Sequence, residues 1–84
     1  MRWVKHDDYC VLSDPPGYAI NRTGGNPEVY TAVRLGQQSG KAWVGSEILH
    51  VERGIDPKDE RVRLEARKRC AEACRRDAAN RETT

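Results

Sequence analysis

The last third of the chain, residues 56–82, has the pattern of one long and heavily charged helix. Asp56 can accept hydrogen bonds from the free N–H groups at a helix start, and Pro57 suits the first helical position. Beyond them, small apolar residues recur at helical spacing and form one stripe. They are Val62, Ala66, Cys70, Ala73 and Cys74. A helix of this length can cover the apolar face of a sheet, so the residues before it are expected to supply that sheet.

Turn-forming residues divide the first half of the chain into short apolar segments, which is typical of an antiparallel meander. The predicted strands are residues 9–13, 18–23, 28–35 and 41–45. The segment 28–35 is the clearest of them, because Tyr30 and Ala32 alternate with Val29, Thr31 and Val33.

Residues 46–54 fit either a fifth strand or one helical turn, and an irregular or short helical connection is favoured. The predicted fold class is therefore α+β: an antiparallel β-meander of three to four strands packed by one long C-terminal α-helix. We expect residues 1–80 to form a single domain and residues 81–84 to be a frayed tail.

The predicted helix is long for so small a domain. A helix rises about 1.5 Å per residue, so about 25 residues span roughly 38 Å, whereas a compact domain of this length is about 30 Å across. We therefore expect the helix to extend beyond the sheet. Past Cys74 the apolar residues are Ala78 and Ala79, so residues 75–82 are expected either to fray or to contact a partner.

Size and composition argue against an enzyme. The chain has 84 residues and no Phe, so its core depends on a few Trp, Tyr and aliphatic side chains, and little surplus is left for an enclosed substrate cavity. His6, Asp7, Asp8 and Cys10 offer a base, an acid and a thiol, but neighbours in sequence point in different directions, so no catalytic residue is predicted.

The three cysteines indicate a reduced protein. Their number is odd and no secretory or membrane segment accompanies them, so we expect a cytoplasmic chain without disulfides and without a membrane partner. Cys70 and Cys74 could supply two zinc ligands if His6, His50 or Cys10 came close. Because no second ligand pair accompanies them, packing beneath the sheet is the favoured role, and neither a metal nor a cofactor is expected.

The last third of the chain carries the excess positive charge. Residues 57–84 hold nine Lys or Arg against six Asp or Glu, while the whole chain has a net charge of only +2. The predicted partner-binding residues are Arg67, Lys68, Arg69, Arg75 and Arg76 of the helix, and Trp43 of the fourth predicted strand. Interleaved acidic residues favour the alternative that this surface is simply solvated. A meander with a basic helix also has the outline of a double-stranded RNA-binding domain.

Several segments resemble small, mostly uncharacterised proteins of bacteriophages and prophages. These are Trp3, His6, Tyr18-Ala19-Ile20, Tyr30-Thr31-Ala32, the Gly45 region and the stretch from Ala66 to Cys70. The chain departs from them at residues 46–59 and at its extended charged end. The resemblance implies a host-directed accessory protein, in its most concrete form an anti-CRISPR inhibitor.

The leading hypothesis is a non-enzymatic, phage-type inhibitor or adaptor that binds a bacterial host protein or ribonucleoprotein complex. Arg-rich anchors suit such an interface. The alternative is a small nucleic-acid-binding domain that uses the basic helix. A homodimer formed through Leu64, Ala71 and Ala78 of the helix also stays open.

Overall fold

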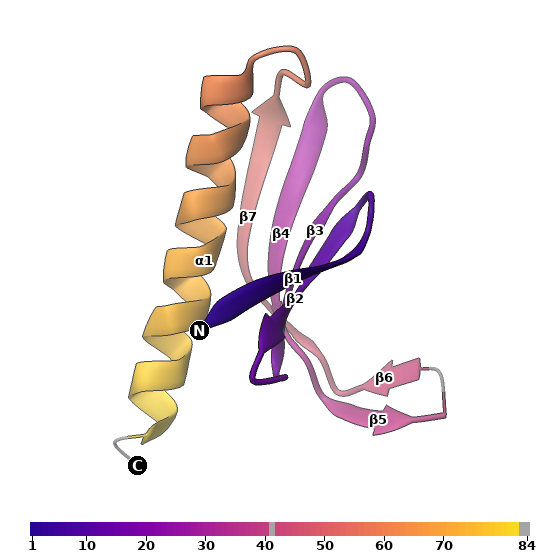
Figure 1. The fold of residues 1–84 in the computed structure, drawn as a ribbon, viewed down its shortest axis with the longest axis vertical. Coiled ribbons are helices and arrows are strands. Elements are labelled where there is room, and N and C mark those ends of the chain that lie inside the picture. The colour runs from indigo at the N-terminus through magenta and orange to yellow at the C-terminus, as the bar shows by residue number, and fades with distance from the viewer. Residues whose placement is uncertain (41, 83–84) are drawn as a thin grey trace.

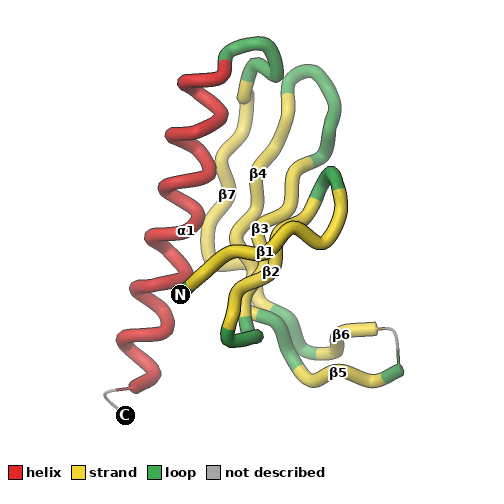
Figure 2. The backbone as a smooth tube through the Cα atoms, viewed as in Figure 1, coloured by secondary structure: helices red, strands yellow, loops and turns green. Residues whose placement is uncertain are grey.

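One helix lies across one face of a five-stranded antiparallel sheet (Figures 1 and 2). The computed structural model describes residues 1–40 and 42–82, leaving aside the side chains of residues 38, 42, 43 and 82. The elements are β1 (Arg2–Asp7), β2 (Cys10–Asp14), β3 (Tyr18–Arg22), β4 (Glu28–Arg34), β5 (Gln37–Ser39), β6 (Ala42–Val44), β7 (Glu47–Ile55) and α1 (Glu60–Glu82). The α+β class is confirmed.

The sheet is a meander whose last connection carries an extra hairpin. Its strand order is β1-β2-β3-β4-β7, and β5 pairs with β6 in a separate two-stranded ribbon between β4 and β7. This ribbon projects from the end of the sheet (Figure 1). Where the chain enters it, a Cβ atom on Gly36 would lie 1.8 Å from the Val44 carbonyl oxygen, so only glycine permits this close approach.

Alternation along β4 places its residues on the two faces as predicted. Tyr30 and Ala32 are buried under α1, while Thr31 and Val33 point to the opposite face. The core joins these residues to β3, the end of β7 and the predicted helical stripe. Its buried members are Tyr18, Ile20, Tyr30, Ala32, Ile55, Ala66, Cys70, Ala71 and Cys74.

Two sheet strands differ from the sequence prediction. The prediction of an irregular or helical connection for residues 46–54 was wrong, because Glu47–Ile55 forms the edge strand β7. This strand pairs with β4, and the register of the pairing shifts at two places. Arg2–Asp7 is the opposite edge strand, for which no strand was predicted. The fourth predicted strand, 41–45, contains β6, which pairs with β5 and not with the main sheet. The sheet therefore has five strands where three to four were expected.

The helix begins later than predicted. The Asp56 Oδ1 atom accepts a hydrogen bond from the Lys58 amide at 2.9 Å, which closes a turn before the helix. The Asp59 Oδ1 atom then accepts from the Val62 amide at 3.2 Å, the contact that an N-cap residue makes. Asp59 is therefore the N-cap, and the assignment of Asp56 to that position was wrong.

The end of the helix is tied to the sheet. The Asp77 carboxylate accepts a hydrogen bond from the Tyr18 hydroxyl at 2.8 Å and another from Arg34 Nη1 at 2.9 Å. Ala78 packs against the core. The expectation that residues after Cys74 have little to contact in their own domain was wrong. Few apolar residues follow Cys74, but Asp77 holds this part of the helix against the sheet through hydrogen bonds. Arg81 and Glu82 belong to α1; residues 83–84 of the predicted tail lie outside the described part of the chain.

Replacing Asp77 tests this anchor. Asp77→Ala is expected to lower the free energy of unfolding by about 1–3 kcal/mol, because the Tyr18 hydroxyl then lies buried without its acceptor. The control, Arg76→Ala, removes an exposed side chain of the same turn and should change it by less than about 0.5 kcal/mol. Urea unfolding followed by circular dichroism measures both, and equal losses would contradict the anchoring role.

Candidate functional site

The predicted basic residues of α1 do not form one surface. Successive helical residues are rotated by about 100°, so Arg67, Lys68 and Arg69 point in three directions. Arg67 lines a pocket between the helix and the sheet. Lys68 is exposed on the outer side of α1, and Arg69 forms an ion pair with Glu52 of β7. Of the three, Arg69 is engaged within the fold, where the hydrogen bond raises its pKa and lowers that of Glu52.

The remaining predicted residues of α1, Arg75 and Arg76, are exposed. The spacing of seven residues places Arg75 on the same side of α1 as Lys68, and Arg76 on the same side as Arg69. Trp43 lies in β6, but its side chain is outside the described part of the structure.

Many of the basic side chains pair with carboxylates. These pairs are Lys5–Asp8, Arg22–Glu28, Arg34–Glu47, Arg34–Asp77, Arg61–Glu65, Arg63–Glu28 and Arg69–Glu52. Pairing of opposite charges leaves little unopposed field around the molecule.

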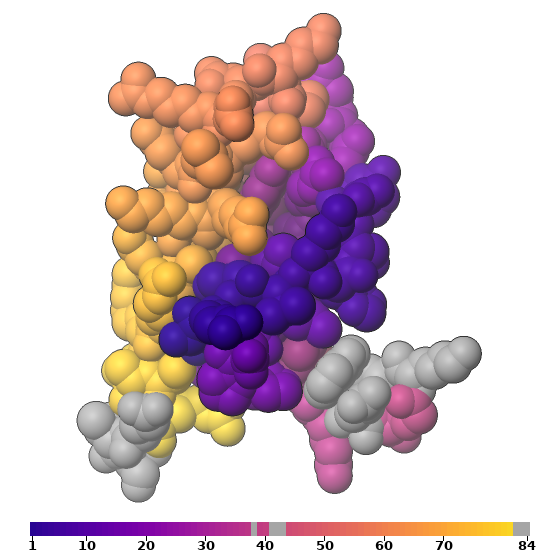
Figure 3. All heavy atoms as spheres, viewed as in Figure 1, coloured from indigo at the N-terminus to yellow at the C-terminus, as the bar shows by residue number. Residues whose placement is uncertain are grey.

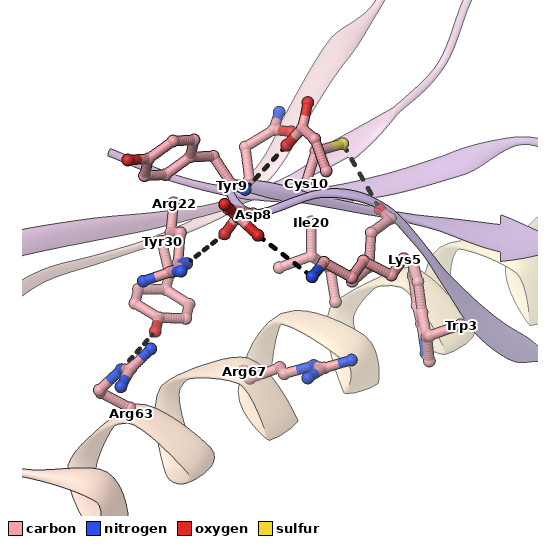
Figure 4. Close-up of a pocket in the computed structure, with 13 residues that line it drawn as sticks. Trp3, Lys5, Asp8, Tyr9, Cys10, Ile20, Arg22, Tyr30, Arg63 and Arg67 are labelled. Atoms are coloured by element: carbon pink, nitrogen blue, oxygen red, sulfur yellow. Dashed lines mark hydrogen bonds and ion pairs between the residues drawn. The ribbon is translucent and has the colours of Figure 1, made fainter. Parts of the chain in front are cut away.

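A pocket of about 370 Å³ lies between the helix and the first four strands (Figure 4). Arg63 and Arg67 border it from α1, and Ile20 and Tyr30 border it from the sheet. The other lining residues are Trp3, Lys5, Asp7, Asp8, Tyr9, Cys10, Val11, Asn21 and Arg22. The sequence did not predict this pocket, because its walls come from five separate elements.

A buried carboxylate holds two of the pocket arginines. The Glu28 side chain is only 1% exposed, and its oxygens lie 3.4 Å from Arg22 Nη1 and 3.7 Å from Arg63 Nε. Arg63 Nε also donates to the Tyr30 hydroxyl at 3.2 Å, which raises the pKa of Arg63. Arg22 Nε donates to the Asp8 carbonyl at 2.8 Å. Both guanidinium groups are thus fixed at the pocket wall.

The face of the sheet opposite α1 carries an apolar row that crosses every strand. Strand register pairs Val4 with Leu12, Leu12 with Ala19, Ala19 with Val33 and Val33 with Ile48. Residues paired in this way point to the same face. At the two edges, Val4 is 48% and Ile48 is 68% exposed. We call these five residues the sheet-face row. It was missed because its ends lie in β1 and β7.

The cysteines are packing residues, as the sequence predicted. Cys70 and Cys74 are fully buried and unpaired. Burial raises the pKa of each to about 11, so both thiols are neutral near pH 7. Cys10 is partly buried, and burial raises its pKa too. Within residues 1–40 and 42–82, no three His, Cys, Asp or Glu side chains gather as a metal site would require.

Two findings bear on the broader classification of the chain. Across the described residues, no helix combines the length and apolar character that crossing a membrane requires. No protein-family model matches the chain, and neither the curated proteins nor the solved structures include a match. The resemblance to phage proteins therefore stays a prediction.

Proposed function

We propose that this chain is a non-enzymatic protein-binding module that docks on its partner through the sheet-face row. The observation that carries the proposal is that an apolar row spans all five strands on the face that α1 leaves uncovered. The adjacent row carries no charge at Cys10, Asn21, Thr31 and Val51, and it ends in β1 at Asp7. A charge-poor centre of this kind is typical of the middle of protein interfaces.

The size of the face indicates what covers it. Five strands about 4.8 Å apart and about five residues long give a face of roughly 320 Å². Two copies packed face to face would bury about 650 Å², below the roughly 1,000 Å² of a stable interface. The same area is too small for any partner by itself, so we propose that the partner is a different protein that also contacts the β5–β6 ribbon. The ribbon projects from the body of the molecule (Figure 3), and Val44 on it is 59% exposed.

Nucleic-acid binding is the second candidate, and charge pairing argues against it. Binding to phosphates requires clustered Lys and Arg side chains that can release counterions. Here Arg34, Arg63 and Arg69 are engaged by carboxylates of their own fold. Arg67 points away from Lys68 and Arg75, and these two share their side of α1 with the acidic residue Glu72. The uncovered sheet face offers an apolar row in place of a basic one.

The partner we propose is a bacterial host protein or ribonucleoprotein complex, which the chain occupies in the manner of an inhibitor or adaptor. The resemblance to small phage proteins supports this choice, and anti-CRISPR activity is its most specific form. An inhibitor of this type acts by stoichiometric occupancy, so it needs a rigid surface and no catalytic group.

Charge placed on the two ends of the row tests the proposal. The double variant Val4→Asp/Ile48→Asp should reduce retention of the partner from a bacterial lysate by about tenfold or more, because each carboxylate would have to be desolvated. Both sites are exposed, so Tm should change little. The matched control is Leu64→Asp, at an apolar residue 60% exposed on α1.

The outcomes separate the alternatives. The proposal is supported if a protein retained by the native chain and by Leu64→Asp is lost with the double variant. It is overturned if Leu64→Asp alone loses the partner, or if the native chain is a dimer by sedimentation and the double variant a monomer. Nucleic-acid binding that falls steeply with salt and survives the double variant would favour the second candidate.

A further inference from the structure

We propose that the pocket between α1 and strands β1 to β4 binds a small organic acid that carries one carboxylate on an apolar or aromatic body. This site lies on the side of the sheet that α1 covers, whereas the sheet-face row lies on the other. The inference therefore stands independently of the docking proposal.

Arg67 supplies the group that would meet the carboxylate. Figure 4 shows its side chain extending from α1 between Arg63 and Trp3. No described residue forms an ion pair or hydrogen bond with its guanidinium group, in contrast to Arg22 and Arg63. A planar guanidinium matches a carboxylate through two parallel hydrogen bonds. Arg67 is thus the cation of the pocket that a ligand can engage without breaking an existing contact.

The net charge of the side chains at the pocket favours a ligand with a single negative charge. The cationic residues at the pocket are Lys5, Arg22, Arg63 and Arg67. Glu28 opposes Arg22 and Arg63 jointly, Asp8 pairs with Lys5, and Asp7 adds one further carboxylate. Four cations and three carboxylates leave one net positive charge, which a single carboxylate neutralises. A phosphate monoester carries about two negative charges at neutral pH and would leave the site negative.

The residues that line the pocket favour a ligand whose remaining part is apolar. Ile20 and Tyr30 form the sheet side, and Trp3 and Val11 lie beside them. The volume of about 370 Å³ lies at the lower end of the range for small-molecule sites. The rings are held in place, since the Tyr30 hydroxyl is bonded to Arg63 and Trp3 packs against the core. An acid with a single ring fits this combination of size and lining.

Fluorescence of Trp3 can report binding. In a Trp43→Phe background Trp3 is the single indole. The probe is 3-phenylpropionate, with uncharged 3-phenylpropionamide and phenyl phosphate as comparisons. We expect the carboxylate to bind at least about tenfold more tightly than the amide, because the charge-assisted hydrogen bonds to Arg67 are lost with the charge. Phenyl phosphate should bind more weakly than the carboxylate.

The matched variants are Arg67→Gln and Lys68→Gln, neighbours in sequence of which only the first lines the pocket. Arg67→Gln should weaken 3-phenylpropionate about tenfold or more, and Lys68→Gln less than about twofold. Neither should lower Tm. Absence of saturable binding, equal affinity for acid and amide, preference for the phosphate, or an unchanged affinity in Arg67→Gln would each overturn the assignment. Partner capture through the sheet face should be unaffected by Arg67→Gln, so the two proposals fail separately.

Discussion

Folding stability is expected to fall steeply between pH 9 and pH 11, because Cys70 and Cys74 ionise at about pH 9.0 when unfolded and at about 11 when folded. The folded state holds the thiol protons more tightly, so the stabilisation is complete below pH 9 and is lost as the pH rises through 11. One pKa unit corresponds to about 1.4 kcal/mol, so the two thiols together account for about 3–5 kcal/mol. For a domain whose total stability is about 4–13 kcal/mol, this loss brings it close to unfolding.

Urea titrations at pH 8, 9, 10 and 11 measure this dependence. The control is Cys70→Ala/Cys74→Ala, which starts from a lower stability because two buried sulfur atoms are removed, but should show a much shallower decline. Tyr18, whose pKa burial also raises, is retained in both proteins and contributes equally to each. Parallel pH curves for the native chain and the double variant would show that the buried thiols are not the cause.

The second large effect is expected from Glu28. Its carboxylate is 1% exposed between Arg22 and Arg63, so Glu28→Ala removes the joint partner of two guanidinium groups and leaves a cavity. We expect the free energy of unfolding to fall by about 3 kcal/mol. Glu28→Gln keeps the shape and should cost roughly half as much, since the amide oxygen can still accept a hydrogen bond.

Glu47→Ala is the matched control. Glu47 also pairs with an arginine, Arg34, but its side chain is 63% exposed, so its removal should cost less than about 1 kcal/mol. Denaturant unfolding compares the variants. If Glu28→Ala proves no more destabilising than Glu47→Ala, then solvent, and not Glu28, stabilises the positive charges of Arg22 and Arg63. Glu28 would then not hold these two side chains in place at the pocket wall.

The parts of the fold that follow a regular period could be predicted from the sequence. The alternation around Tyr30 and the stripe through Ala66, Cys70 and Cys74 each describe a single element with one buried face, and both are confirmed. The glycine and proline turns likewise separated β2, β3 and β4. In these segments local sequence and tertiary packing favour the same structure.

The edge strands could not be predicted because neither shows an uninterrupted alternation of buried and exposed residues. In β7 the register shifts twice against β4, so the two-residue alternation that marks a strand is interrupted between Ile48 and His50 and again near Ile55. In β1 most side chains are exposed, so the strand depends on pairing with β2 more than on its own sequence. A row of residues that crosses a sheet can be predicted only when all of its strands are. Because β1 and β7 were not predicted, the sheet-face row was not recognised.

The contacts that form the pocket and anchor the helix are long-range. Asp77 is separated from Tyr18 by 59 positions and from Arg34 by 43, and no periodic pattern encodes such a pairing. Arg67, Lys68 and Arg69 were predicted together as partner-binding residues, but a helix rotates successive residues by about 100° and so places them on different sides. Arg67 and Lys68 are both exposed, and the observed packing places only Arg67 at the pocket, while Arg69 pairs with Glu52.

The central proposal is that the sheet-face row is the docking surface, and methyl cross-saturation NMR on the partner complex tests it most directly. Saturation of the partner should transfer to the methyl groups of Val4, Leu12, Val33 and Ile48, on the face that α1 leaves uncovered. The exposed Leu64 methyl groups on α1 should receive none. Transfer to Leu64 with no transfer to Val4 or Ile48 would place the partner on the helix and contradict the proposal.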